Sequence, residues 1–154
     1  MKSNFFENKK VLITGHTGFK GSWLSYYLYL LGADVMGISL KPKLKNSLYD
    51  ILNLKKKIKS NYVNILNKKS LQKKILDFKP NIIFHLAAQA IIKESYINPI
   101  NTWNTNLIGS IHMLEIIRNL KKQCTCVMIT SDKCYKNLEN KNGYKENDIL
   151  GGDD

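Results

Sequence analysis

The chain has 154 residues, of which 44% are hydrophobic and 23% are charged, and these globular proportions exclude a disordered or low-complexity protein. No run of about 18 apolar residues occurs, which excludes a transmembrane helix, and the short Phe5-Phe6 pair cannot form a secretory signal, so we expect a cytoplasmic protein. The net charge of +12 comes almost entirely from dispersed lysines, since Arg118 is the only arginine, and this favours solvated surfaces over a nucleic-acid-binding face.

Apolar runs alternate with helical patterns along the chain, which predicts a parallel sheet with crossover helices. Gly32 stands where a left-handed helix cap belongs, and we take Ser70 as an N-cap. The expected elements in chain order are a strand at 10–14, a helix at 19–31, a strand at 34–39, a small helix within 41–59, a strand at 61–65, a helix at 70–78, a strand at 81–86, a helix at 102–121 and a strand at 124–130.

These elements predict an α/β fold: a Rossmann-type doubly wound sheet of five strands in the order 3-2-1-4-5, within one domain over residues 1–154. The helix at 102–121 is expected to turn one apolar stripe toward the sheet, formed by Leu107, Ile111, Leu114, Ile117 and Leu120. Doubly wound sheets bind ligands at the carboxyl ends of their strands, so the residues that follow strands one, four and five are the candidates for function.

A glycine-rich turn follows the first strand, with Gly15, Gly18 and Gly21 in the string TGHTGFKG. Glycines permit positive φ, close approach of the backbone to a pyrophosphate, and close packing of the helix on the sheet. The helix that follows offers free N–H groups to an anion. Because the turn lies between a predicted strand and a predicted helix, it indicates a dinucleotide site.

The glycine spacing and the string HLAAQ at 85–89 resemble the extended short-chain dehydrogenase/reductase family. The strings GHTGFKGSWLS at 15–25, TSDKCY at 130–135 and GYKEND at 143–148 narrow the resemblance to the nucleotide-sugar 4,6-dehydratases within it. The resemblance implies a tightly held NAD that serves as a regenerated oxidant. It also implies CDP-glucose as the substrate and, for the full-length relatives, a homodimer.

The resemblance also implies cofactor contacts. The pyrophosphate would lie at Gly15, Thr17, Gly18, Phe19, Lys20 and Gly21. The nicotinamide side would lie at Leu86, Ala87, Ala88 and Gln89, with Thr105, Asn106 and Thr130 nearby. Asn64 and Ile65 match positions beside adenine. Ser39 stands where an acidic residue commonly holds the ribose hydroxyls, and Lys41 and Lys43 after it leave NADP open, although we favour NAD.

Catalytic roles are implied for three residues after the fifth strand. Ser131 resembles the hydroxyl that hydrogen-bonds the oxygen on carbon-4 of the sugar, and Asp132 resembles the acid that protonates the departing hydroxyl. Lys133 stands where related enzymes carry a glutamate base. A lysine acts as a base only when its pKa falls well below about 10.4, so Lys133 is either the base or a charged stabiliser of the enolate. We expect no metal site, because the three cysteines match no common zinc pattern.

The family's Tyr-x-x-x-Lys motif does not occur in the 154 residues. We therefore expect these residues to be the cofactor-binding portion of a longer enzyme, without the substrate domain, and unable to catalyse dehydration alone. Two alternatives stay open: an epimerase or reductase acting on another nucleotide sugar, and a noncatalytic dinucleotide-binding module. The Asp132-Lys133 pair argues against a plain epimerase, which has no water to expel.

Overall fold

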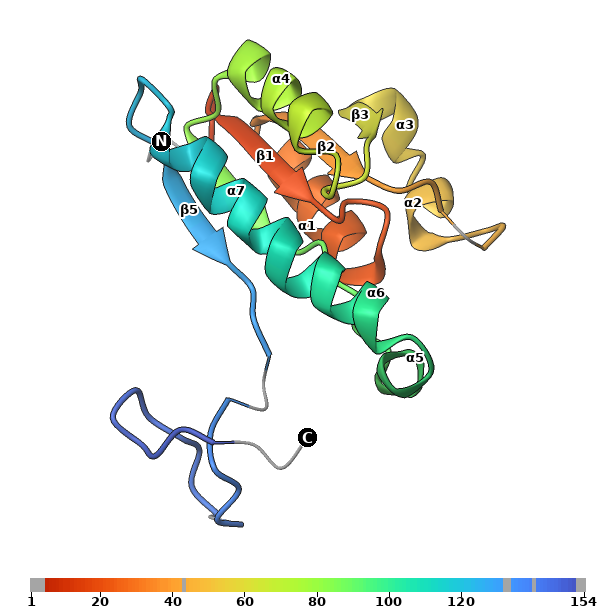
Figure 1. Ribbon diagram of the computed structural model, residues 1–154. Helices are drawn as coiled ribbons and strands as arrows, with labels where there is room; N and C mark the ends of the chain where they lie inside the picture. The colour runs from red at the N-terminus through yellow and green to blue at the C-terminus, as the bar shows by residue number, and fades with distance from the viewer. Residues whose placement is uncertain (1–4, 43, 132–133, 140, 152–154) are drawn as a thin grey trace.

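The computed structural model describes residues 5–42, 44–131, 134–139 and 141–151, and the sheet lies in the first two of these ranges. Five parallel strands pair in the order β3-β2-β1-β4-β5, which confirms the predicted fold (Figure 1). The elements in chain order are β1 (Lys10–Thr14), α1 (Phe19–Leu30), β2 (Asp34–Ser39), α2 (Leu48–Ile51), α3 (Leu54–Lys57), β3 (Lys59–Tyr62), α4 (Lys68–Phe78), β4 (Ile82–His85), α5 (Ile92–Ile97), α6 (Pro99–Trp103), the π-helical η1 (Asn104–Ile108), α7 (Gly109–Arg118) and β5 (Thr125–Met128).

Helices cover both faces of the sheet, and alternate residues of β1 show why. Leu12 faces a core formed with α4 and α7, and Val11 and Ile13 face a second core formed with α1, α2 and α3. All three side chains are fully buried. Strands with two buried faces read as continuous apolar runs, which is the pattern from which this strand was predicted. Among the residues described, no helix is long and apolar enough to span a membrane.

The first helix ends as the sequence predicted. Gly32 has a φ of +79°, and its N–H donates to the Tyr29 carbonyl. The helix turns small residues toward the sheet, since Gly21, Ser22 and Ser25 are buried beside Leu28. This close approach brings the first turn of α1 against the end of β1, where the glycine-rich turn lies.

The predicted bounds of the third strand and the predicted start of the helix after it were wrong. The third strand occupies Lys59–Tyr62 rather than 61–65, so Asn64 and Ile65 follow the strand instead of ending it. The fourth helix starts at Lys68, and its N-cap is Asn67, whose Oδ1 accepts the Ser70 N–H at 3.0 Å. Asparagine is as good an N-cap as serine. Asn67 comes before Ser70 in the chain, and α4 therefore starts after Asn67.

The long helix predicted at 102–121 differs most from expectation. It begins at Pro99, a favoured first residue, ends at Arg118, and contains the π-helical turn η1. Gly109, Met113 and Ile116 face the core, while Leu107, Ile111 and Leu114 are 45%, 47% and 52% exposed, so the predicted inward stripe was wrong. Only Ile117 and Leu120 of that stripe pack against the core, and both are partly buried.

The described residues after β5 fold back on themselves. Tyr135 pairs with Leu150 in an antiparallel bridge, and its ring stacks on Tyr144 with centroids 5.2 Å apart. Figure 1 shows this segment lying apart from the sheet.

The two cysteines at β5 are half-buried free thiols: Cys124 lies just before the strand and Cys126 lies within it. Burial raises the pKa of Cys126 to about 11.

Candidate functional site

The glycine-rich turn folds tightly between β1 and α1. Gly15 has a φ of +76°, and its N–H donates to the Ile38 carbonyl at 2.8 Å, which ties the turn to β2. Its carbonyl accepts the Gly18 N–H at 3.0 Å. A Cβ on Gly21 would overlap the Gly15 carbonyl oxygen, so only glycine allows α1 to start this close to the strand. The turn therefore has the close backbone packing that a pyrophosphate cradle requires.

The start of α1 carries no side-chain cap from the described residues, although Gly18 occupies the N-cap position. The first N–H groups of a helix have no partner within the helix, and together with the helix dipole they attract an anion. Phe19 and Lys20, the next two residues, are exposed. The arrangement leaves backbone donors at the mouth of the turn, where a phosphate group would meet them.

The end of β2 is joined to the turn by side chains. Thr17 Oγ1 lies 2.7 Å from Ser39 Oγ and 3.0 Å from the Leu40 carbonyl oxygen. A hydroxyl has one proton, and a carbonyl can only accept, so Thr17 donates to Leu40 and Ser39 donates to Thr17. Ser39 Oγ thus keeps acceptor capacity at the edge of the site. The structure brings these two predicted residues together.

The segment after β4 runs against the same turn. The backbone N–H groups of Leu86 and Ala87 both donate to Thr14 Oγ1 at 3.1 Å. A Cβ on Gly15 would lie 3.0 Å from the Ala87 nitrogen, so the two backbones touch. Ala88, the next residue, is exposed. Ala87 therefore borders the glycine turn, and Ala88 follows it at the surface.

Gln89 is held from two sides. The Asn106 side chain accepts the Gln89 N–H at 2.7 Å and donates to the Gln89 carbonyl oxygen at 2.9 Å. The Gln89 side chain donates to Thr102 Oγ1 at 2.9 Å. Asn106 lies in η1 together with Thr105, which is half-buried. The irregular turn of the helix is thus bonded directly to the strand exit.

The two residues expected beside adenine lie in a turn after β3. Asn64 Oδ1 accepts the Leu66 N–H at 2.9 Å, which forms a local side-chain turn. Ile65 is buried against Gly109, where a Cβ would overlap the Ile65 side chain, and its carbonyl accepts a hydrogen bond from His112 Nδ1 at 3.1 Å. Asn64 is exposed toward solvent and Ile65 is mainly a core residue.

Of the predicted catalytic residues, Asp132 and Lys133 lie outside the described residues. Thr130 and Ser131 are exposed and lie shortly after β5, which ends at Met128. The Ile129 N–H still donates to the His85 carbonyl at 3.0 Å, so the chain leaves the sheet beside the end of β4. The segment that contains Ser131 therefore leaves the sheet at the carboxyl end of the strands, where the glycine turn and the exit of β4 also lie.

Two buried histidines were missed as parts of this site. His16, inside the glycine turn, is fully buried, and neither ring nitrogen has a hydrogen-bond partner among the described residues. Burial lowers the pKa of His16 to about 4, and the nearby Ile38 backbone offsets this lowering only in part. The imidazole meets Tyr49 edge-on at 5.4 Å between centroids and lies above Gly37, where a Cβ would overlap it. A glycine inside an apolar strand is the sequence signal for such an approach.

His85 is the second, 2% exposed at the end of β4. Its Nδ1 lies 2.8 Å from Thr14 Oγ1 and its Nε2 lies 3.3 Å from Ser110 Oγ. Burial lowers the pKa of His85 to about 4, so the imidazole is neutral at pH 7. The sequence marks this residue only as a polar end to an apolar strand, and its partners are too distant along the chain to be read from it.

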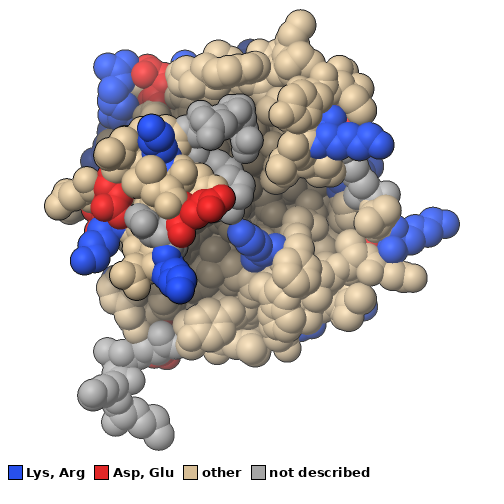
Figure 2. Space-filling model, turned by 90° about the horizontal axis from the view of Figure 1, so that it is seen from below, with Lys and Arg blue, Asp and Glu red and all other residues tan. Residues whose placement is uncertain are grey.

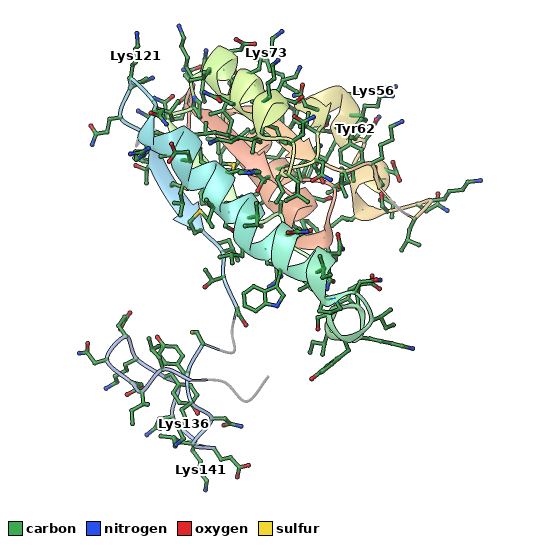
Figure 3. All side chains as sticks on the ribbon, in the orientation of Figure 1. Lys56, Tyr62, Lys73, Lys121, Lys136 and Lys141 are labelled. Carbon is green, nitrogen blue, oxygen red and sulfur yellow. The ribbon has the colours of Figure 1, made fainter. Side chains whose placement is uncertain are left out.

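Charge is dispersed around this side of the molecule. Figure 2 shows the side toward which β1 and β5 point in Figure 1: most of it is uncharged, lysines stand at separate places, and the surface is hollowed near its centre. Figure 3 shows labelled lysines pointing outward from different elements, such as Lys56 on α3, Lys73 on α4 and Lys136 in the last segment. A nucleic-acid-binding surface would gather such charges on one face.

Comparison with known proteins agrees with the family resemblance that the sequence motifs predict. Residues 12–151 match the family model described as GDP-mannose 4,6 dehydratase. The chain is 44% identical to CDP-glucose 4,6-dehydratase of Salmonella typhimurium over 151 residues, which cover 98% of this chain and 42% of that relative. It is 30% identical to CDP-paratose 2-epimerase of Salmonella typhi over 142 residues, 90% of this chain and 40% of that relative. The chain thus spans less than half the length of these curated relatives.

The fold is shared with solved structures. UDP-glucose 4-epimerase of Thermus thermophilus in complex with NAD superposes with a TM-score of 0.79 at 24% identity, over 93% of this chain and 44% of that one. The resemblance expected from the glycine turn and the TSDKCY string is confirmed by the family model and the sequence relatives.

Proposed function

The chain belongs to the GDP-mannose 4,6 dehydratase family, and from this premise we propose that it binds NAD at the carboxyl end of its sheet and serves the dehydration of CDP-glucose to CDP-4-keto-6-deoxyglucose. The observation that supports dinucleotide binding is the glycine turn, packed too tightly for a Cβ at Gly21, followed by the start of α1, which no described side chain caps. The identity of 44% over 98% of the chain supports the choice of CDP-glucose.

The residues present fit a dinucleotide. The turn and α1 are packed so closely that a Cβ on Gly21 would overlap the Gly15 carbonyl oxygen, and the start of α1 offers backbone N–H donors for a phosphate group. In this proposal Thr17, Gly18, Phe19 and Lys20 surround the pyrophosphate. The segment from Leu86 to Gln89, with Thr105 and Thr130, borders the nicotinamide half, and Asn64 with the Ile65 backbone borders adenine.

NAD, when bound, supplies a hydride acceptor at carbon-4 of the sugar and returns the hydride at carbon-6. In our proposal, Ser131 donates a hydrogen bond to the carbon-4 oxygen and Asp132 gives a proton to the hydroxyl that leaves carbon-6. Lys133 acts on the acidified carbon-5 proton, as a neutral base or as a charged group beside the enolate. What supports this is the position of Ser131 just beyond β5, at the sheet edge that carries the glycine turn.

Ser39 stands at the position of the ribose hydroxyls in this proposal. Its hydroxyl, which donates to Thr17, can accept from a ribose hydroxyl, as NAD requires. A carboxylate at this place would repel the 2′-phosphate of NADP, and serine does not. We therefore propose NAD as the cofactor, with a weaker selection against NADP than an acidic residue would give.

We expect the 154-residue chain to bind NAD saturably and NADP more weakly, and to form no 4-keto sugar from CDP-glucose. Calorimetric titration with each dinucleotide measures the first two, and ultraviolet detection of the 4-keto product measures the third. Absence of binding to both dinucleotides would contradict the proposed site. Product formation would show that the Tyr-x-x-x-Lys motif is dispensable, whereas binding without turnover is also the behaviour of a noncatalytic dinucleotide-binding module.

We further propose self-association through the outward face of α5 to α7. Large apolar side chains line it, and an exposed apolar stripe of this kind marks an interaction surface. The residues are Ile92, Tyr96, Ile97, Ile100, Trp103, Leu107, Ile111 and Leu114, each between 45% and 76% exposed.

Substitution tests this surface. Sedimentation velocity is expected to show a concentration-dependent dimer for the unmodified chain and a monomer for Leu114→Lys, because a lysine on the apolar face must be desolvated on association. Leu44→Lys is the matched control, since Leu44 is 76% exposed and lies outside that face. A monomer at all concentrations, or equal behaviour of the two variants, contradicts the proposal.

A further inference from the structure

A chain of hydrogen bonds starts at the Thr14 hydroxyl, and its direction follows from the single proton of that group. Thr14 Oγ1 accepts the N–H groups of Leu86 and Ala87, each at 3.1 Å, and the Leu86 N–H is shared with the Thr14 carbonyl oxygen at 3.3 Å. A threonine hydroxyl has two acceptor sites and one proton. With both acceptor sites used, the hydroxyl proton must point at His85 Nδ1, 2.8 Å away. His85 Nδ1 is therefore an acceptor.

The remainder of the chain of bonds follows from that assignment. A neutral imidazole that accepts at Nδ1 carries its proton on Nε2, which then donates to Ser110 Oγ at 3.3 Å. Ser110 Oγ donates in turn to the Asn106 carbonyl oxygen at 2.6 Å. The bonds therefore run in one direction, from Thr14 through His85 and Ser110 to Asn106, and they cross from β1 through β4 to the long helix.

Both ends of this chain hold the segment that leaves β4. At one end Thr14 binds the backbone of Leu86 and Ala87; at the other Asn106 clasps the backbone of Gln89 on its N–H and its carbonyl. Ala87 in turn touches Gly15. The two clamps lie on different elements, and His85 is the side chain that joins them.

We propose that His85 is a positioning residue for the dinucleotide, holding the β4 exit in register with both the glycine turn and η1 as a neutral imidazole protonated on Nε2. The proposal rests on the proposed function, because it assigns the β4 exit to the cofactor. π-Helical turns within α-helices are frequent at functional sites, and here the turn faces a segment it must hold in place. A proton added to Nδ1 would face the Thr14 hydroxyl proton and break the first bond.

The tautomer is tested without any ligand. Long-range ¹H–¹⁵N correlation spectra of the ¹⁵N-labelled chain at pH 7, with the His85 signals identified by their loss in His85→Phe, are expected to show a neutral ring protonated on Nε2. A ring protonated on Nδ1, or a charged ring, overturns the inference. This measurement decides the chain of bonds even when no dinucleotide binds, in which case the proposed function fails separately.

The positioning role is tested by NAD affinity. Thr14→Val keeps the shape and removes the hydroxyl, and Ser110→Ala interrupts the chain further along; we expect about tenfold and about fivefold weaker NAD binding, as the loss of a hydrogen bond of ordinary strength gives. Thr14→Ser retains the hydroxyl and is expected to restore affinity to within about twofold of the unmodified chain.

A matched control separates positioning from general loss of stability. Ile75→Ala empties a fully buried site on α4, on the same side of the sheet but outside the cofactor contacts, and is expected to lower the unfolding midpoint without changing NAD affinity. The double variant Thr14→Val with His85→Phe should bind NAD no more weakly than the weaker single variant, because both break one chain. Unmodified affinity in Thr14→Val and Ser110→Ala, or additive losses in the double variant, overturns the proposal.

Discussion

Replacing Gly21 by alanine is expected to abolish NAD binding and to lower the free energy of unfolding by about 3 kcal/mol or more, because the new methyl group overlaps backbone that cannot move aside. The overlapping atoms are the carbonyl group of Gly15 and the Cα of His16, and both belong to the glycine turn itself. Relief of the clash requires α1 to move away from β1, which opens the cradle proposed for the pyrophosphate. Urea unfolding and calorimetric NAD titration measure the two losses.

Two other glycines provide a graded comparison. A Cβ on Gly18 would lie 3.3 Å from the Gly15 carbonyl oxygen, a tight contact that small shifts relieve, so Gly18→Ala should fall between Gly21→Ala and the unmodified chain. A Cβ on Gly143 meets nothing within 4 Å, and Gly143→Ala is expected to change the free energy of unfolding by less than about 0.5 kcal/mol. Equal NAD affinity for Gly21→Ala and Gly143→Ala would show that the turn holds no dinucleotide.

Acid is expected to destabilise the fold between pH 6.5 and pH 4 through the two buried histidines. Burial lowers the pKa of His16 and of His85 from 6.5 to about 4. In this window the unfolded chain takes up the protons and the folded chain does not, so the free energy of unfolding falls as the pH falls, by about 1.4 kcal/mol per pH unit for each histidine. Above pH 6.5 both states are neutral at these rings and the effect is absent.

His16→Phe isolates one of these contributions. The substitution keeps an aromatic ring between Gly37 and Tyr49 and removes two buried nitrogens that lack partners among the described residues. We compare the free energy of unfolding of His16→Phe with that of the unmodified chain by urea unfolding. The difference in favour of His16→Phe is expected to grow by at most about 3 kcal/mol as the pH falls from 7 to 4. Ile75→Ala removes no titratable group, so its free energy of unfolding should depend on pH in parallel with that of the unmodified chain. A parallel curve for His16→Phe as well would contradict a depressed pKa at this site.

The sheet and the glycine turn were predictable because local sequence determines them. Apolar runs such as Val11–Thr14 are buried on two faces, and the alternation with helices fixes the strand order within narrow topological rules. The inward face of α7 was not predictable in the same way. That helix is apolar on more than one side, and both Leu114 and Met113 lie on stripes that satisfy the helical period. Gly109 was the overlooked signal, since it faces the buried Ile65 side chain.

The site was only partly predictable for a related reason. The cradle residues are neighbours in sequence, whereas the bonds that hold the β4 exit join Thr14 to His85 across 71 positions and His85 to Ser110 across 25. No spacing rule links such positions, because the sheet order brings them together. His85 stands in the HLAAQ string, and the geometry adds which atoms it joins.

The contact between His16 and Gly37 constrains how this protein can evolve. The imidazole occupies the volume that any side chain at position 37 would need, so a larger residue there is tolerated only after position 16 has become small. The reverse order passes through a variant in which the His16 imidazole and the new side chain on β2 compete for one space. Drift at these two positions is therefore directional, since replacement of Gly37 depends on an earlier replacement of His16.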